Sequence, residues 1–370
     1  MNSKLIIFIF LVQLASIMCQ TGTNMKDLYT ELFTTRSYNI NLRPSTDLSV
    51  PTLVTVDFYL VSINSLDDIS EIFTTVGYLR ISWFDQYLTW TPSSYGGIND
   101  LYHPQGSVWK PDISLQNGVS KMQELGSNFI HVNVHNTGKI TWEPFEVFQS
   151  RCTVNTKFFP FDKQTCNLIF VCWSYKATDV NMTSGNNGIN FYEHFETNGE
   201  WDIVTSSSDV DYDVEVKLTF SITIQRKSGY FVLNIMMPVV LLSILNLFTF
   251  VVPCESGERL GYAITVWLSF AVFLTIVGAS LPTSSRYTSV ISVYLMLQLT
   301  VGTIVVIGTT LEIRMIGFSK EKIQIPRILI PFTCSLFIAA CLKCSDHRKR
   351  GVQVKDLILI RLFNRHTSTF

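Results

Sequence analysis

A stripe of seven residues in one apolar segment has the most distinctive chemistry in the 370-residue sequence. It recurs at helical spacing and consists of Glu258, Gly261, Thr265, Leu268, Val272, Ile276 and Ala279. The stripe is charged or small at its first end, hydroxylated in the next turn and apolar in the middle. A helix surrounded by lipid would have no reason for this gradient, so the stripe favours a water-filled path. Glu258 alone is also explained as a carboxylate that stabilises a helix N-terminus.

Residues that could support catalysis or hold a metal ion form no comparable arrangement. The histidines within residues 21–228 are scattered without ligand-like spacing, at His103, His131, His135 and His194. No nucleophile elbow or phosphate loop accompanies them, so an enzyme, a metal site and a cofactor are disfavoured. The net charge of −1 carries no polyanion-binding signature, and nucleic acid is not expected as a partner.

The stripe runs through the second of three apolar segments, at 230–252, 260–281 and 290–311. Each is about 22 residues long, which is the length of a transmembrane helix. With 47% hydrophobic residues and a mean hydropathy of +0.26, the chain is also apolar for a soluble protein. Three such segments in succession predict membrane-spanning helices. Pro238 predicts a kink in the first of them.

The segment before the membrane region is expected to be secreted. Residues 1–20 combine Lys4 with a short apolar run and predict a cleaved signal peptide. Residues 21–228 are expected to form an extracellular all-β sandwich with a short N-terminal helix at 27–33. Strands are predicted at 52–63, 76–83, 128–134, 139–142, 165–170 and 214–224, where β-branched and aromatic residues cluster. The sequon at Asn181 predicts glycosylation in a surface loop.

The end of the chain has two interpretations, a cytoplasmic segment or one that includes a fourth transmembrane helix. Residues 229–312 hold the three membrane helices, and residues 313–370 are expected to be cytoplasmic. The segment 323–342 is apolar but contains Pro326 and Pro331, and a basic cluster follows it at 343–350. This cluster favours the cytoplasmic side, so a fourth transmembrane helix near 323–342 remains the alternative.

Cys152 and Cys166 enclose thirteen residues, among them an aromatic-Pro-Phe-Asp core formed by 159–162. This segment resembles the signature loop of Cys-loop receptors, and 109–112, 173–175 and 199–202 are similar to other extracellular motifs of nicotinic acetylcholine receptors. With the three apolar segments, the resemblance extends over nearly the whole chain to about residue 315. It implies a disulfide between Cys152 and Cys166.

The same resemblance implies a coupling role for Phe159, Pro160 and Asp162, which would pass ligand-induced motion to the pore. Arg226, just before the first membrane segment, resembles the family's coupling arginine. A cation that anchors the helix at the membrane interface is the alternative for Arg226.

Members of the family bind an amine in a cage of aromatic rings at subunit interfaces, because ring faces attract a partly desolvated cation. Trp173 matches the central tryptophan of that cage, and Tyr78 lies where the neighbouring subunit presents an aromatic ring. Tyr212 lies in the segment 205–213, which is expected to be the loop that closes over the ligand. That segment lacks the adjacent cysteine pair, and Gln116 stands where acetylcholine-binding subunits carry a tyrosine. The chain therefore resembles a non-α subunit.

Repeated around five subunits, Glu258 would form a carboxylate ring that concentrates cations at the cytoplasmic mouth of the pore. The Pro-Ala insertion usual in anion-selective relatives is missing here, which favours cation selectivity. Monovalent cations are the expected permeating ions. Leu268 and Val272 would form hydrophobic rings that close the resting pore by dewetting. Ala279 replaces a carboxylate found in strongly calcium-permeable members, so we expect a modest calcium preference.

The sequence therefore predicts a subunit of a neurotransmitter-gated, cation-selective channel, homo- or hetero-pentameric. It would be a multi-pass plasma-membrane protein in the lipid bilayer, with an extracellular N-terminus and a postsynaptic location. A non-conducting or assembly-modifying subunit without a competent agonist site is the alternative function. A soluble ligand-binding protein of the same extracellular fold is disfavoured by the three apolar segments.

Overall fold

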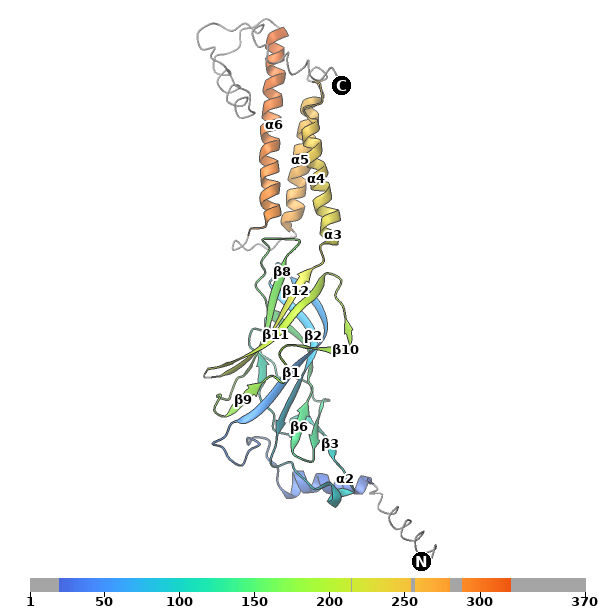
Figure 1. Cartoon of the computed structure of the whole chain (residues 1–370), viewed down its shortest axis with the longest axis vertical. Coiled ribbons are helices and arrows are strands. Elements are labelled where there is room, and N and C mark those ends of the chain that lie inside the picture. The colour runs from blue at the N-terminus through green and yellow to red at the C-terminus, as the bar shows by residue number, and fades with distance from the viewer. Residues whose placement is uncertain (1–19, 214, 254–256, 280–287, 321–370) are drawn as a thin grey trace, which may run out of the picture. The chain divides into compact units, whose positions relative to one another are not determined.

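The structure is a computed structural model that describes residues 20–213, 215–253, 257–279 and 288–320, with side chains up to residue 314. The chain divides into two compact units, Met1–Ser228 with Pro282–Tyr287, and Gly229–Leu281 with Thr288–Phe370. The first unit holds the strands and the second holds the long helices (Figure 1). The predicted signal segment, apart from Gln20, and the segment 323–342 lie outside the described residues.

The first helix among the described residues of this unit is α2 (Gly22–Tyr29), which continues as a π-helical turn, η1 (Thr30–Thr35). Leu28 and Leu32 are fully buried, and Phe33 packs against the same core. The predicted N-terminal helix and its apolar face are confirmed. The helix starts five residues earlier than the apolar spacing suggested, because its first turn is polar and carries no hydrophobic signal.

Twelve strands follow among the described residues, and they form two sheets. One sheet has the order β10-β1-β2-β6-β5-β3, with β9 paired to β1 and β7 to β2, and the other has the order β11-β12-β8-β4. The predicted β sandwich is confirmed. The strands are β1 (Thr52–Asp67), β2 (Ile72–Phe84), β3 (Asp100–Pro104), β4 (Ile113–Leu115), β5 (His131–His135), β6 (Lys139–Trp142), β7 (Phe145–Arg151), β8 (Lys163–Cys172), β9 (Val180–Thr183), β10 (Asn190–Glu196), β11 (Trp201–Tyr212) and β12 (Val216–Arg226).

The two sheets meet over a core of alternating apolar residues. In β12, every second residue is buried from Val216 to Ile224, as expected for a strand with one face on the core. Four phenylalanines close the centre: Phe58 and Phe148 from the larger sheet contact Phe170 and Phe220 from the smaller one. Ring centroids lie 5.4 Å apart between Phe148 and Phe170 and 5.9 Å apart between Phe58 and Phe220.

The segment 205–213 is not the loop that its composition suggested. It lies almost entirely in β11, which pairs with β12 in antiparallel register from Trp201↔Arg226 to Tyr212↔Val216. Serine and aspartate are depleted in most strands, but β11 is an edge strand whose side chains are mostly exposed. An edge strand with mostly exposed side chains needs no alternation of apolar residues, so its serine and aspartate residues predict a loop from the sequence.

The sequon asparagine is likewise in a strand and not in a loop. Asn181 lies in β9, where it pairs with Leu53 of β1 in parallel register. Its side-chain oxygen is buried, while the residue as a whole is half-exposed. The short run Val180–Thr183 has too few residues for its alternation to be recognised in the sequence.

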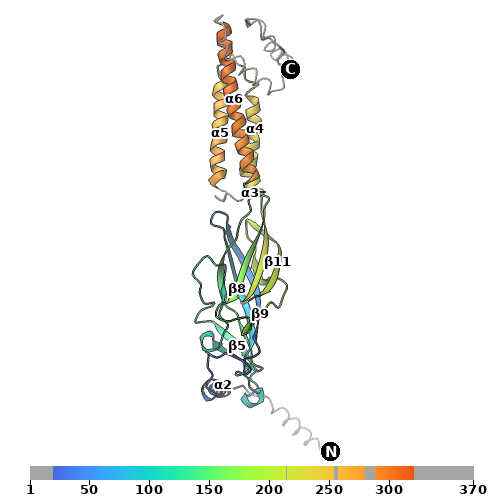
Figure 2. The same ribbon diagram turned by 90° about the vertical axis from the view of Figure 1, so that its left-hand side faces the viewer.

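In its described residues, the second unit has three long helical segments that run alongside one another (Figure 2). Within the part of the chain that the structure describes, three spans are long and apolar enough to cross a membrane, Gly229–Phe248, Arg259–Ala279 and Val290–Arg314, close to the predicted segments. The first span is α3 (Gly229–Phe231), a π-helical turn η4 (Val232–Met236) and α4 (Met237–Phe248). The second is α5 (Arg259–Ala279), and the third belongs to α6 (Val290–Lys320).

Pro238 lies in the first turn of α4, directly after the π-helical turn. A proline ring has no N–H to donate and clashes with the preceding turn of a regular helix. The wider turn before Pro238 is one of the known ways in which a helix accommodates this. The hydrogen-bond spacing of this helix therefore changes just before Pro238, and the kink itself stays a prediction.

Hydrogen bonds join α4 with α5, α4 with α6, and α5 with α6. Trp267 of α5 donates its indole N–H to the Thr303 hydroxyl of α6 at 2.9 Å, and the Ser243 and Tyr294 hydroxyls join α4 and α6 at 2.9 Å. A Cβ atom on Gly302 would lie 3.1 Å from the Trp267 ring, so glycine permits this close approach. Polar contacts of this kind hold helices together where lipid offers no hydrophobic driving force.

Candidate functional site

The disulfide predicted between Cys152 and Cys166 is present. Cys152 directly follows β7, and Cys166 lies within β8, so the bond closes the loop between these two strands, which belong to different sheets. Phe159, Pro160 and Asp162 of the loop are all buried. The predicted coupling residues are therefore packed into the β unit.

Arg226, the last residue of β12, joins a buried charge cluster with Asp162. Its Nε lies 3.0 Å from Asp162 Oδ1, and its Nη2 lies 3.2 Å from Asp162 Oδ2. A second carboxylate completes the cluster, because Arg226 Nη2 donates to Asp68 Oδ2 at 2.7 Å. Only 4% of the Arg226 side chain is exposed, which does not fit a cation that reaches for the membrane interface.

Two aromatic rings flank the same guanidinium. The Arg226 carbon Cζ lies 4.3 Å from the Trp201 ring centroid and 5.1 Å from that of Phe159. Gln164 supports the cluster by donating to Asp162 Oδ2 at 2.6 Å. Sequence reasoning found Asp162 and Arg226 but missed Asp68, because the turn between β1 and β2 carries no motif that marks it.

Burial raises the pKa of Asp68 above its ordinary value, and the neighbouring Arg226 opposes that shift. The Asp162 carboxylate adds to the increase, since two negative charges share one guanidinium. Protonation of Asp68 on acidification would therefore remove one of the two anionic partners of Arg226.

Two of the predicted ligand residues lie at one end of the four-stranded sheet. Trp173 directly follows β8 and is 56% exposed, and Tyr212 ends β11 and is 60% exposed. Tyr212 pairs with Val216, and the next residue of β12 pairs with Val171, two positions before Trp173. A large exposed aromatic ring at the end of a strand is available for a ligand, so Trp173 is not a core residue.

Gln116 directly follows β4 on the adjacent strand and is exposed. Its backbone N–H donates to the Ile169 carbonyl at 2.7 Å, four residues before Trp173 along β8. Within one chain the structure therefore brings Trp173 and Tyr212 to the same sheet end, with Gln116 on the neighbouring strand.

Two hydrogen bonds hold the segment around Trp173. Asp112 Oδ2 accepts from the Ser174 backbone N–H at 2.5 Å, and the Trp109 indole N–H donates to the Tyr175 hydroxyl at 3.3 Å. Burial raises the pKa of the adjacent Cys172 thiol well above its ordinary value, and the Asp112 carboxylate adds to this. Cys172 therefore stays a neutral thiol, and its role is structural.

Tyr78 belongs to the other sheet, in β2, and is half-buried. Its ring stacks on Tyr59 with centroids 4.8 Å apart and planes at 6°, and it meets Tyr192 edge-on at 6.2 Å. The guanidinium of Arg80 lies 4.5 Å from the Tyr59 ring centroid and is held by Glu143 at 2.6 Å. The predicted aromatic is therefore part of a tyrosine cluster that already contains a cation, which the sequence did not reveal.

All seven residues of the predicted stripe lie on the exposed side of the second membrane helix. Glu258 immediately precedes α5, and the other six are in it. Leu268, Val272 and Ile276 are 55%, 50% and 50% exposed. The opposite face is packed inside the unit and consists of Arg259, Ala263, Val266, Phe270 and Val277. The helix thus has one face against its neighbours and one that they leave uncovered.

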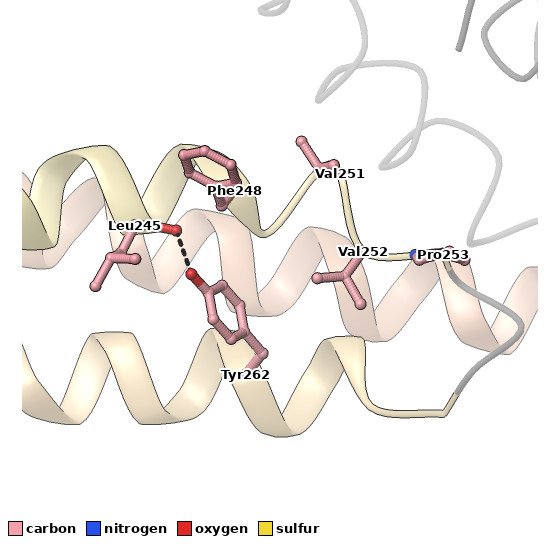
Figure 3. A pocket seen from close by; sticks show the side chains of 6 residues that line it. All are labelled: Leu245, Phe248, Val251, Val252, Pro253 and Tyr262. Carbon is pink, nitrogen blue, oxygen red and sulfur yellow. Dashed lines mark hydrogen bonds between the residues drawn. The ribbon is translucent and has the colours of Figure 1, made fainter. Parts of the chain in front are cut away.

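An open apolar pocket of about 380 Å³ lies between the ends of α4 and α5. The Tyr262 hydroxyl crosses it and donates to the Leu245 carbonyl at 2.9 Å (Figure 3). None of the predicted site residues lines it. The lining residues are Leu245, Phe248, Val251, Val252, Pro253 and Tyr262.

Comparison with known proteins agrees with this architecture. Residues 25–228 match the neurotransmitter-gated ion-channel ligand binding domain, and residues 235–320 match the neurotransmitter-gated ion-channel transmembrane region. The chain belongs to the neurotransmitter-gated ion-channel family. This is a family of ligand-gated channels and not of enzymes.

Individual relatives are nicotinic acetylcholine receptor subunits. Acetylcholine receptor subunit beta-like 1 of Drosophila melanogaster is 31% identical over 312 residues, which is 82% of this chain and 59% of that protein. Acetylcholine receptor subunit beta-type acr-2 of Caenorhabditis elegans is 30% identical over 82% of this chain and 53% of its own length. Neuronal acetylcholine receptor subunit beta-4 of Gallus gallus is 32% identical over 75% of this chain and 59% of its own length.

The chain thus spans between 53% and 59% of the length of these three relatives. Together with the three apolar helices, the family makes it a multi-pass protein of the plasma membrane.

Proposed function

We propose that the chain is a subunit of a cation-selective pentameric channel in which agonist binding at extracellular subunit interfaces opens a pore lined by α5. The observation that carries this proposal is the division of α5 into two faces. The seven stripe residues are exposed, whereas Ala263, Val266 and Phe270 are packed against the other helices. A helix that lines a shared axis needs such an uncovered polar-to-apolar face.

In the pentamer, five copies of Glu258 form a ring of carboxylates at the cytoplasmic mouth, which attracts cations and repels anions. Thr265 provides a hydroxylated level, and Leu268 and Val272 provide two apolar rings that exclude water in the closed state. With Ala279 at the outer end there is no second carboxylate ring, and monovalent cations are the main permeating ions.

The agonist is a small-molecule amine, bound between Trp173 and Tyr212 of one subunit and Tyr78 of the next. Each ring face that meets a desolvated cation contributes about 0.5–2 kcal/mol. The exposure of Trp173 and Tyr212 at one sheet end supports their place on the same side of an interface. If the neighbour is another copy, this chain supplies both sides of the interface. If the neighbour is a related subunit, this chain supplies one side.

Coupling between agonist binding and pore opening runs through the loop closed by the disulfide. Phe159, Pro160 and Asp162 of this loop are buried, and Arg226, which pairs with Asp162, ends the strand that precedes the first membrane helix in sequence. Its buried ion pairs support a role as a rigid connection. The protein is glycosylated at Asn181 and acts at the postsynaptic membrane.

A non-conducting or assembly-modifying subunit is the second candidate, and a specific observation favours it. Arg80 holds a positive charge against the tyrosine cluster that contains Tyr78, where it would repel an amine. Gln116 also takes the place of an aromatic ring. Expression of the chain alone and with a related α-type subunit separates the candidates, since only a conducting homomer gives agonist-evoked current alone.

The pore proposal is tested by single cysteine substitutions along α5 in the full chain. Charged thiol reagents should block current in cysteine variants of Thr265, Leu268 and Val272, which are on the exposed face. Matched variants of Val266 and Phe270, one to three residues away on the buried face, should not react. Equal reaction on both faces, or none on the exposed face of a conducting channel, contradicts the proposal.

A further inference from the structure

Glu258 is followed directly in the sequence by a positive charge, Arg259. If both side chains faced the pore, the negative charges of five glutamates and the positive charges of five arginines would cancel, and the ring would not select for cations. The position of the Arg259 guanidinium therefore matters as much as that of the Glu258 carboxylate. This inference rests on the proposed pore and names a residue that controls its selectivity.

The Arg259 side chain is turned into the helical unit and is 7% exposed, whereas Glu258 is exposed. Its Nη1 lies 3.0 Å from Oε2 of Glu312, which belongs to α6. Its Cζ also lies 5.7 Å from the ring centroid of Phe250, which follows α4. Contacts from two other segments thus hold the guanidinium away from the exposed face of α5.

We propose that Glu312 is a positioning residue that determines charge selectivity through Arg259. By pairing with the guanidinium inside each subunit, it leaves the Glu258 carboxylates to set the sign of the potential at the inner mouth. Glu312 itself does not line the pore in this arrangement. Its effect is indirect and depends on the presence of Arg259.

Removing the Glu312 charge makes the buried position unfavourable for Arg259. A buried guanidinium that loses an anionic partner carries a larger desolvation penalty, and the long arginine side chain relieves it by extending toward water. Successive residues are about 100° apart around a helix, so water on the adjacent exposed face, beside Glu258, is within reach. The arginine would then neutralise the ring.

The expected size follows from the Coulomb energy of one such charge. At about 5 Å in water, a unit charge changes the Boltzmann weight of a monovalent ion about fourfold, and the cation-to-anion ratio about 16-fold. Salt screens part of this effect, so we expect Glu312→Gln to lower the cation-to-anion permeability ratio at least about fivefold.

The experiment compares the full-length chain with Glu312→Gln, Arg259→Gln and the double variant, using reversal potentials in diluted sodium chloride. Glu312→Gln should lower the ratio, Arg259→Gln should preserve it, and the double variant should restore it. A purely structural role of Glu312 would not be rescued by removing Arg259. Failure of the double variant to restore the ratio overturns the inference.

Two controls separate this inference from the pore proposal. Glu258→Gln should lower the ratio by itself, and if it does not, the pore assignment fails. If Glu258→Gln lowers the ratio while Glu312→Gln leaves it unchanged, only the inference fails. Arg314→Gln changes a charge two residues further along α6 and should leave the ratio unaltered. A shift of similar size and opposite sign in that variant would mean that any charge at this end of α6 acts on the pore through space, which also overturns the inference.

A second measurement does not need conduction. The same four chains, purified in detergent, give melting temperatures from which the coupling between Arg259 and Glu312 is obtained as a double-mutant cycle. A favourable coupling supports the pairing, and additive effects of the two substitutions overturn it.

Discussion

The buried pair between Asp162 and Arg226 gives the sharpest test of the extracellular unit. Asp162→Asn keeps the shape of the side chain but removes the charge that accepts two hydrogen bonds from Arg226, at 3.0 and 3.2 Å. The two side chains are 2% and 4% exposed, so the loss is not compensated by water. Breaking a buried ion pair on one side costs about 3–5 kcal/mol. Because Asp68 still partners Arg226 at 2.7 Å, we expect the lower end, about 3 kcal/mol.

The assay is the apparent melting temperature of the purified full chain. For a unit of about 200 residues, 3 kcal/mol corresponds to a decrease of about 6–12 °C. The matched control is Glu143→Gln, which breaks the pair with Arg80 at 2.6 Å, whose side chains are 43% and 45% exposed. An exposed pair contributes about 0.2–1 kcal/mol, so this variant should change little. Equal shifts in the two variants would refute the reasoning that burial decides the contribution.

Three further predictions concern the pore, the agonist site and pH. Leu268→Thr wets the apolar ring, and should raise apparent agonist sensitivity or produce spontaneous current; an unaltered dose-response curve would contradict the pore register. Gln116→Tyr adds an aromatic ring beside the site of Trp173, and should lower the agonist concentration for half-maximal current, whereas Trp173→Ala should raise it. Burial and the nearby His131 lower the pKa of His103 below its ordinary 6.5, so the folded protein takes up this proton less readily than the unfolded chain. Stability should be complete above pH 6.5 and fall as the pH drops through the lower folded value, and His103→Phe should flatten this dependence of the melting temperature between pH 7 and 5.

The elements with a strong local signal could be predicted from the sequence. Length and hydropathy predict the three membrane helices, because most residues of such a segment must be apolar where they face lipid or pack against the other helices. The loop closed by Cys152 and Cys166 carries a specific motif. The exposed face of α5 follows from helical periodicity alone, since a residue's direction around a helix is fixed by its position.

What the sequence did not reveal depends on contacts between distant segments. Asp68 is 158 positions from Arg226, and no local pattern links the two. The serine and aspartate residues of the segment 205–213 predict a loop, but they lie on an exposed edge strand whose pairing with β12 no local pattern indicates. The contact between Arg80 and Tyr59 required the pairing of β1 with β2, which brings them side by side on the sheet.

The Arg226 cluster also constrains how this protein can change over generations. One guanidinium meets Asp68, Asp162 and two ring faces at once, and a lysine has neither the planar fork nor the stacking surface to replace it. Loss of either carboxylate alone leaves the arginine undercompensated, so tolerated replacements must occur at several of these sites together. Divergent descendants of this chain should therefore keep the set intact or lose it as a whole.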